Sequence, residues 1–206
     1  MTRTCDKCRR EVGLDARGRK IRHFCKPIRS WRKFPETDTH RHGLSRSWGA
    51  AESSEYAVWI LANPSTADGR LDDPTIAEVC RFTEDVIGLE AAIVVNIYAK
   101  RATNPKCLKG MDDLVDSTDQ YIADALDGAK VCMVGWGTCL VGVRHQDVAL
   151  DDRVKRVGEL ISEAKLTAQC LGRNEATRRT RVATPWHPLK AARNHPRPIT
   201  LQEWKW

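Results

Sequence analysis

Two asparagines and one histidine carry the functional groups with the clearest chemical use in this sequence. An asparagine amide has donors and an acceptor, so it can hold a polar ligand or orient a water molecule, although it cannot remove a proton from that water. A histidine can donate a hydrogen bond to a carbonyl oxygen as negative charge develops there. Such groups together suit polar-ligand binding and hydrolysis. The three residues are Asn63, Asn96 and His187.

These residues and their neighbours also have structural interpretations. Both asparagines follow apolar runs and could cap loops, and the His-Pro pair that starts at His187 could be a turn. Asp73 stands where a helix would begin, which favours the role of N-cap over that of a general base. Arg101 either contacts a phosphate or lies on the surface, and Trp136 is expected in the core.

Four residues near the N-terminus have the spacing of a structural zinc site. A Cys-x-x-Cys pair is followed, after a gap, by a histidine and a third cysteine. A bound zinc ion would order a polar segment that has no apolar core of its own. The second half of the site is not a clean Cys-x-x-Cys pair, so His40 or His42 could replace one ligand. The candidate ligands are Cys5, Cys8, His23 and Cys25.

Apolar runs alternate with amphipathic segments from residue 56 onwards, which predicts an α/β fold with a mostly parallel sheet and helices on both faces. In such a sheet the functional groups gather at the carboxyl ends of the strands, where Asn63 and Asn96 stand. Strands are expected at 56–62, 91–96, 131–134 and 166–171, and helices at 72–88, 113–126 and 151–164.

Four short motifs, in this order, resemble those of the uracil-DNA glycosylase superfamily. There the first strand ends in Gly-x-Asn/Asp-Pro, a later strand ends in Asn, a third leads into a Trp-Gly turn, and a His-Pro motif follows. Residues 39–190 also resemble a poorly characterised phage and bacterial family with that fold, through the segments 39–48 and 63–67 in particular. The four matching segments are 61–65, 93–96, 134–137 and 186–189.

The resemblance implies a three-layer α/β/α fold and a monofunctional DNA glycosylase, which flips a base out of DNA and hydrolyses its N-glycosidic bond. Asn63 would position the water, and Asn96 and His187 would hold the base. Tyr98 or Trp48 would stack on the flipped ring. No cofactor is implied for catalysis, and Lys100 replaces a cysteine that an iron–sulfur cluster would need. The other expected substrate contacts are Pro64, Ser65, Tyr98, Arg101 and Leu189, of which Leu189 would fill the vacated stack.

The chain departs from the uracil enzymes at two places. Ala62 stands where many relatives carry another small or acidic residue, and Leu189-Lys190 stands where the uracil enzymes prefer Ser-Pro. Uracil is therefore not assumed to be the excised base. The phage and bacterial setting of the related family suggests a hypermodified phage base, such as glucosylated hydroxymethylcytosine, whose excision would serve antiviral defence.

Charge is distributed unevenly along the 206 residues. Residues 1–50 hold 14 Lys/Arg and 5 Asp/Glu, a net charge of +9, and residues 173–206 hold 8 and 2, a net charge of +6. The middle of the chain is acidic, at −8. Basic flanks are typical of proteins that bind a phosphate backbone, although a solvated surface would look the same. We therefore expect a basic arm over 1–50, an α/β domain over 51–206, and DNA as the partner.

Other features of the composition favour a monomeric cytoplasmic protein. The sequence has no apolar run long enough to span a membrane and no apolar signal segment at its start. Its eight cysteines do not indicate a disulfide framework in that compartment. Two other functions remain open: an N-glycosidase for free nucleosides or nucleotides, and a non-catalytic nucleic-acid-binding module.

Overall fold

A computed structural model describes ten segments of the chain. They are residues 2–4, 11–13, 34–49, 55–68, 72–102, 115–138, 144–145, 148–177, 183–194 and 199–206. The candidate zinc ligands Cys5, Cys8, His23 and Cys25 lie outside these segments, as does most of the expected N-terminal arm.

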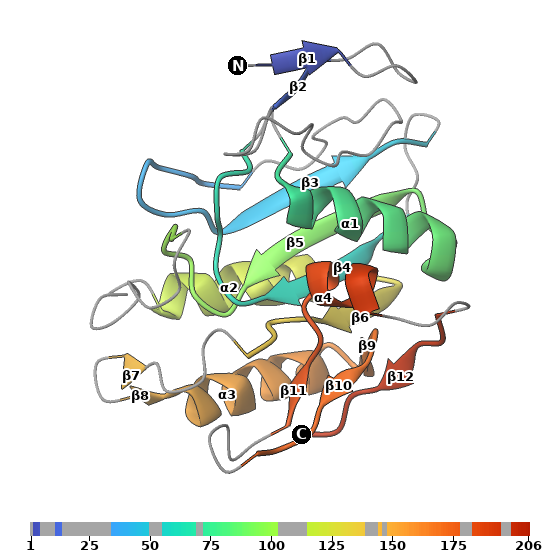
Figure 1. The fold of residues 1–206 in the computed structure, drawn as a ribbon. Helices are drawn as coiled ribbons and strands as arrows, with labels where there is room; N and C mark the ends of the chain where they lie inside the picture. Colours follow the sequence, from blue (N-terminus) through green and yellow to red (C-terminus); the bar gives the residue numbers. More distant parts are fainter. Residues whose placement is uncertain are drawn as a thin grey trace.

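Six strands form the central sheet, in the order β12-β9-β6-β4-β5-β3 (Figure 1). The four inner strands are parallel to one another, and the edge strands β3 and β12 are antiparallel to their neighbours. The protein therefore has the expected α/β class with a mostly parallel sheet. The strands are β3 Gly43–Ser47, β4 Ala57–Leu61, β5 Ala91–Asn96, β6 Val131–Val134, β9 Ala168–Cys170 and β12 Gln202–Glu203.

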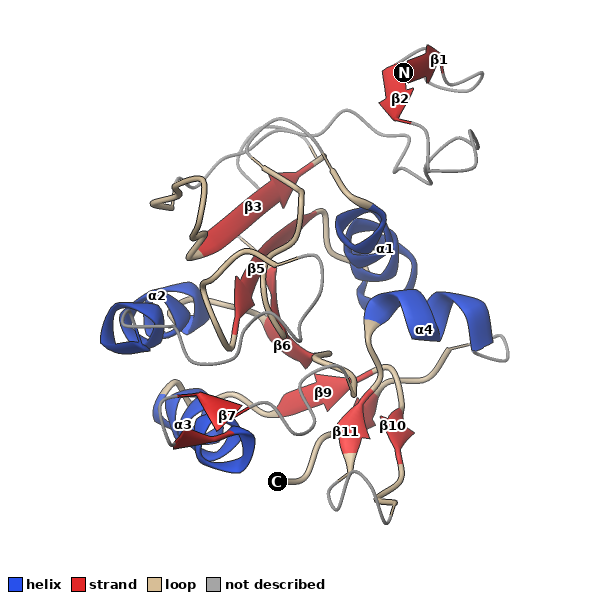
Figure 2. Cartoon of the chain, turned by 60° about the vertical axis from the view of Figure 1, so that its left-hand side comes forward, coloured by secondary structure: helices blue, strands red, loops and turns tan. Residues whose placement is uncertain are grey.

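Four α-helices accompany the sheet, with α2 and α3 on one side of it and α1 and α4 on the other (Figure 2). They are α1 Pro74–Phe82, α2 Val115–Leu126, α3 Leu150–Glu163 and α4 Pro188–Asn194. A π-helical turn, η1 Thr83–Ile87, continues α1. Three small hairpins complete the described elements: β1 Thr2–Thr4 with β2 Glu11–Gly13, β7 Arg144–His145 with β8 Val148–Ala149, and β10 Arg173–Asn174 with β11 Thr184–Pro185.

Strand β4 explains why the expected strands are continuous apolar runs. All five of its residues are buried. Val58 and Ile60 pack into the core cluster that includes residues of α2 and α3, whereas Trp59 and Leu61 pack into the cluster on the α1 and α4 side. A central strand that is covered on both faces needs apolar side chains at every position, and it therefore shows no alternation of polar and apolar residues.

The first helix begins and ends where the sequence predicts. Asp73 is its N-cap, and the side chain accepts a hydrogen bond of 2.9 Å from the amide of Ile76. Pro74 occupies the first helical turn, where the amide that proline lacks would have no partner. The helical segment ends after η1 at Gly88, whose φ of 78° is in the left-handed region that glycine adopts without strain. No described helix combines the length and apolar character that a membrane-spanning segment requires.

The strand order locates the expected ligand site. From β4 the chain moves to β5 on one side and then crosses to β6 on the other side. The order of the sheet therefore reverses at β4. In open parallel sheets, a reversal of this kind opens a crevice at the carboxyl ends of the strands, and ligands bind there.

The two ends of the chain contribute more to the fold than the sequence suggests. Strand β3 lies within the first fifty residues, where an irregular arm is expected, yet it pairs with β5 along its whole length. Helix α4 and strand β12 lie in the tail, where loops are expected. Strand β3 contains a single large apolar residue, Leu44, so its sequence carries no strand pattern, and its pairing with β5 is a tertiary effect.

Candidate active site

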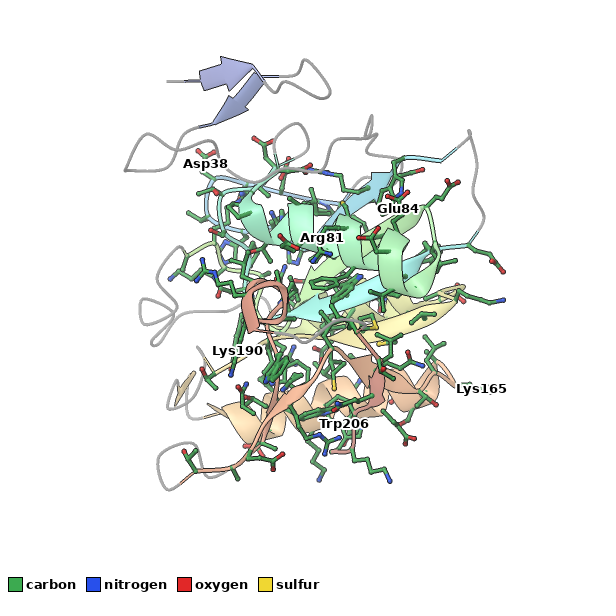
Figure 3. All side chains as sticks on the ribbon, turned by 45° about the vertical axis from the view of Figure 1, so that its right-hand side comes forward. Asp38, Arg81, Glu84, Lys165, Lys190 and Trp206 are labelled. Carbon is green, nitrogen blue, oxygen red and sulfur yellow. The ribbon has the colours of Figure 1, made fainter. Side chains whose placement is uncertain are left out.

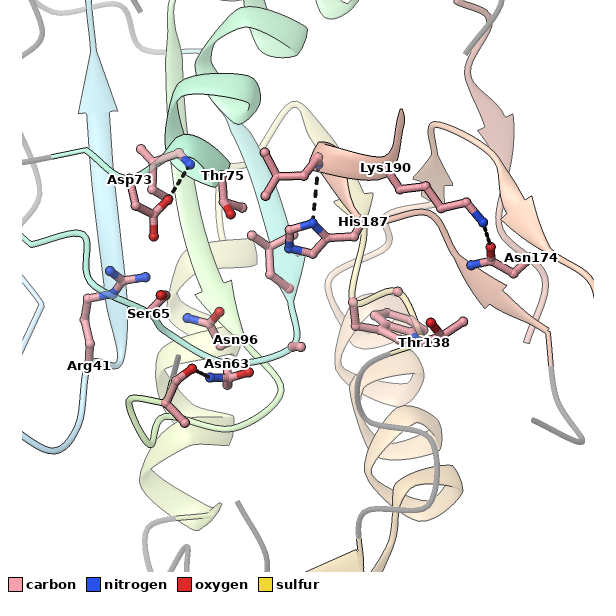
Figure 4. Close-up of a pocket in the computed structure, with 17 residues that line it drawn as sticks. Arg41, Asn63, Ser65, Asp73, Thr75, Asn96, Thr138, Asn174, His187 and Lys190 are labelled. Carbon is pink, nitrogen blue, oxygen red and sulfur yellow. Dashed lines mark hydrogen bonds between the residues drawn. The ribbon is translucent and has the colours of Figure 1, made fainter. Parts of the chain in front are cut away.

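A cavity of about 380 Å³ lies at the carboxyl ends of β4, β5 and β6 (Figure 4). The first turn of α1 and the residues at the start of α4 also line it. The volume is in the range of roughly 300–1,000 Å³ that is usual for small-molecule sites. The cavity occupies the crevice that the strand order predicts.

Asn96, the last residue of β5, presents an unpaired amide to this cavity. The residue is 1% exposed, and neither the nitrogen nor the oxygen of its amide has a hydrogen-bond partner within the described residues. A buried polar group without a partner costs about 1–3 kcal/mol of stability. A ligand that offers both an acceptor and a donor would satisfy the amide and recover that energy.

The side chain of Asn63, unlike that of Asn96, is held by hydrogen bonds, since both hydrogens of its amide nitrogen are donated. It donates to the carbonyl oxygens of Pro64 (2.9 Å) and Ala102 (2.7 Å), which occupies both amide hydrogens. These two bonds also determine which end of the amide is the oxygen. The oxygen is left as an acceptor in a residue that lines the cavity, where it can receive a hydrogen bond from water or ligand.

His187 enters the cavity as a neutral donor. The amide of Leu189 donates to Nδ1 over 3.3 Å, so Nδ1 is the acceptor nitrogen and the proton lies on Nε2 (Figure 4). Burial lowers the pKa of His187 below its ordinary value of 6.5, and the charge of Asp73 opposes that effect in part. The imidazole therefore offers a neutral Nε2–H group at neutral pH.

A buried cation and a buried carboxylate line the same cavity. Arg41 is 2% exposed, and its Nη1 donates to the carbonyl oxygen of Ala67. Burial lowers the pKa of Arg41 to about 10, although the charge of Asp73 raises it. The guanidinium is therefore still protonated at neutral pH. Asp73 is 8% exposed and has one carboxylate oxygen occupied by the cap of α1.

Three arginines hold the loop that follows β4, which carries Asn63. Arg101 donates through Nη1 to the carbonyl oxygens of Ser65 (3.3 Å) and Ala67 (3.1 Å). Arg46 donates through Nη2 to the carbonyl oxygen of Asp68 (2.6 Å), and Arg41 adds its bond to Ala67. Carbonyl groups in a loop have no partners in the sheet and need other donors. A guanidinium group carries five N–H donors, so it can satisfy several of these carbonyl groups at once. The loop is thereby fixed against the sheet.

A fourth arginine supports the backbone next to Asn96. Arg153 of α3 donates to the carbonyl oxygen of Ile97 (3.0 Å) and forms an ion pair of 2.6 Å with Asp119 of α2. The guanidinium is 3% exposed, so two helices are connected to the end of β5 through a buried group. Removal of one partner from such a pair leaves a buried charge and is strongly destabilising.

Residues 41–189 match a protein family described as "Protein of unknown function (DUF1643)". The match covers 149 of the 206 residues. The chain belongs to this family. No curated protein and no solved structure matches the chain. The DUF1643 region contains every residue that lines the cavity except Lys190, so the cavity is a feature of the DUF1643 domain itself.

The DUF1643 fold brings together five of the residues that the sequence singles out. They are Asn63, Ser65, Asn96, His187 and Leu189. Pro64 lies beside them, and its carbonyl oxygen accepts hydrogen bonds from Asn63 and from the amide of Ala102.

Other predicted contacts lie outside the cavity wall. Tyr98 is 0% exposed in the core cluster on the α2 and α3 side, and Trp48 is buried in the cluster on the opposite side. Neither ring lines the cavity. Trp136 is buried in the core as expected, at 1% exposure, and it also lines the cavity. Arg101 also lies outside the cavity wall, where it donates to loop carbonyl oxygens and forms an ion pair of 2.8 Å with Glu36.

Several other residues that line the cavity could not be predicted from the sequence. Arg41 belongs to the 39–48 motif, but its position in the cavity depends on the pairing of β3 with β5. Lys190 donates to the side-chain oxygen of Asn174 across the mouth of the cavity, and these residues lie sixteen positions apart. Among the described residues, no group of three or more His, Cys, Asp or Glu side chains could hold a metal ion.

Proposed function

We propose that this protein is a DNA glycosylase with a three-layer fold like that of the uracil-DNA glycosylases. It flips a modified base into the cavity and hydrolyses the N-glycosidic bond, which leaves an abasic site. The observation that carries the proposal is the buried, unpaired amide of Asn96 in the cavity wall. A nucleobase edge presents donors and acceptors side by side, which is what an amide of this kind can bind.

The other two polar groups suit the two charges that develop in the reaction. As the glycosidic bond breaks, the base gains negative charge and the sugar gains positive charge. The Nε2–H group of His187 can donate to a carbonyl oxygen of the departing base. The amide oxygen of Asn63 can orient a water molecule towards the sugar carbon, because both of its amide hydrogens are already bonded elsewhere.

The volume of the cavity accommodates a base that carries a substituent. A volume of about 380 Å³ leaves room beyond a single pyrimidine ring, and polar residues line both sides of the site. We propose a hypermodified base of phage DNA as the substrate, with glucosylated hydroxymethylcytosine as the first to test. Antiviral defence would be the corresponding biological role, exercised on DNA in the cytoplasm.

The test is an abasic-site assay on duplexes that contain uracil, 5-hydroxymethyluracil, 5-hydroxymethylcytosine or its glucosylated form. We expect alkali-labile sites in at least one duplex. A second assay, on free nucleosides that carry the same bases, distinguishes base excision from DNA from nucleoside hydrolysis. Release from nucleosides alone would support the N-glycosidase alternative, and DNA binding without release would support a non-catalytic module.

The matching variant is Asn63→Ala. We expect its single-turnover rate to fall on the order of a hundredfold or more, as for other lost transition-state hydrogen bonds, while its affinity for DNA stays the same. Gln120→Ala, which removes an amide from the exposed face of α2, is the control and should leave the rate unchanged. An Asn63→Ala protein with the full wild-type rate would show that this residue does not act on the water.

A further inference from the structure

We propose that Asp73 is a catalytic residue as well as the N-cap of α1, and that its carboxylate takes the proton from the water molecule that Asn63 orients. This inference rests on the glycosylase function proposed above. It assigns the base of the reaction, which the amides and the neutral imidazole of the cavity do not supply.

The position of Asp73 gives its two carboxylate oxygens different surroundings. Oδ1 accepts the hydrogen bond of 2.9 Å from the amide of Ile76. Figure 4 shows the second oxygen pointing away from the helix, to the side of the cavity where Arg41 and Ser65 lie. The residue is only 8% exposed, and it is the one carboxylate among the described residues that line the cavity.

The cap bond by itself does not require a charge at this position. Serine and asparagine cap helices about as well as aspartate, although the charge of an aspartate also interacts favourably with the N-terminus of the helix. The cap bond occupies one carboxylate oxygen of Asp73, and the second oxygen faces the cavity, where a bound water molecule can reach it.

The charge of Asp73 affects the pKa values of two residues that line the cavity. It raises the pKa of Arg41 on the β3 side and the pKa of His187 on the α4 side, against the effect of burial in both cases. The carboxylate therefore lies within electrostatic reach of the groups that would surround a bound nucleotide. In a cavity that excludes water, such a charge acts more strongly on a developing sugar cation than it would in solvent.

The chemistry requires an acceptor for one proton. The water oxygen forms a bond to the sugar C1′, the C1′–N bond breaks, and its electron pair goes to the base. The water proton passes to the second oxygen of Asp73, since the Asn63 amide oxygen orients water but is too weak a base to accept it. The departing base is held by His187 and Asn96 and takes a proton from solvent, and Asp73 returns its own proton to solvent.

Asp73→Asn separates the two roles, because asparagine keeps the cap and removes the charge. We expect its single-turnover rate to fall by about 10²–10⁴-fold on whichever of the four duplexes the wild-type protein cleaves. Its melting temperature and its affinity for the same DNA should stay near the wild-type values. Glycine is also tolerated at an N-cap, so Asp73→Gly should fold, and added formate should raise its rate by restoring a carboxylate.

The control is Asp85→Asn, which removes an exposed carboxylate from η1. Asp85 is 52% exposed, pairs with Arg81 only over 3.4 Å and does not line the cavity, so its loss should leave the rate unchanged. A wild-type rate in Asp73→Asn, an equal loss in both variants, or no response of Asp73→Gly to formate would each overturn the inference and leave the glycosylase function standing. Absence of base release by the wild-type protein on all four duplexes would overturn both.

Discussion

At the scale of single residues, the three groups in the cavity differ in how far the protein already satisfies them. Both amide hydrogens of Asn63 are bonded, and one ring nitrogen of His187 is bonded. Asn96 makes no side-chain hydrogen bond within the described residues. The first two side chains are therefore held in fixed orientations before a ligand arrives, while Asn96 depends on the ligand. Sites often carry such local instability because binding compensates for it.

Asn96→Leu should separate stability from function. Leucine replaces a buried unpaired amide with an apolar group, which we expect to raise the free energy of unfolding by about 1 kcal/mol. Base release should be lost, because the edge of the base has no partner. Urea titration and the abasic-site assay measure the two effects. A clear loss of stability would mean that the amide is already paired in the free protein.

The buried imidazole of His187 predicts a particular pH dependence of stability. Its pKa in the folded protein lies below the ordinary value of 6.5, because burial disfavours the charged form. As the pH falls below about 6.5, the unfolded chain takes up this proton before the folded protein does. The associated stability is complete above that pH and is lost as the pH falls through the folded-state pKa.

His187→Gln removes this titration. As the pH falls from about 7.5 to about 5, the free energy of unfolding of the wild type should therefore decrease more than that of the variant. Urea titrations across that range measure it. A difference that is constant with pH would mean that the imidazole is as easily protonated in the folded protein as in the unfolded chain.

At the scale of elements, the loop after β4 depends on segments that are distant in sequence. Three of its carbonyl oxygens accept hydrogen bonds from Arg41, Arg46 and Arg101, and they belong to Ser65, Ala67 and Asp68. These donors come from the β3 segment and from the loop after β5. Without them, a loop of this length would sample many conformations, and the orientation of Asn63 would vary.

Arg101→Ala tests whether this arginine holds the loop or binds phosphate. If it holds the loop, the rate of base release should fall by roughly tenfold, because Asn63 is less well oriented, and the salt dependence of DNA binding should not change. Loss of a phosphate contact would instead reduce the slope of log affinity against log salt by about one. Lys130→Ala, which removes a cation from an exposed ion pair with Glu55, is the control.

At the scale of the whole molecule, the charge is segregated between the flanks and the centre of the chain. The basic flanks carry net charges of +9 and +6, and the middle carries −8. Figure 3 shows Lys190, in α4, and Lys165, after α3, on opposite sides of the view. Lys190 lines the cavity mouth, so the tail brings positive charge to the place where DNA would approach.

The salt dependence of DNA affinity tests this distribution. Replacing Arg29, Arg32 and Lys33 with glutamine should flatten the slope of log affinity against log salt by up to about three. These three residues lie outside the described segments, so the expectation rests on their charge alone. The control replaces the exposed Lys130, Lys155 and Lys165, which belong to the acidic middle of the chain. Equal effects of both triple variants would mean that only net charge matters.

The inner strands and the asparagines at their ends could be predicted from local sequence patterns. The runs that form β4 and β5 are apolar throughout, because helices cover both faces of those strands. Such runs are recognisable without a structure, and the residues that follow them must lie at the carboxyl edge of a parallel sheet. For the same reason Asn63 and Asn96 could be predicted to lie near each other.

The other side chains of the cavity are brought there by contacts between segments that are distant in sequence. Arg41 enters the cavity because β3, a strand without an apolar pattern, pairs with β5. Tyr98 stands two residues after Asn96, yet it turns into the core and is fully buried. Asp73 is a helix cap in the sequence and becomes a cavity-lining carboxylate only when α1 packs against the sheet and α4. Local patterns determine an element from its own residues, whereas a cavity depends on contacts between elements that no local pattern records.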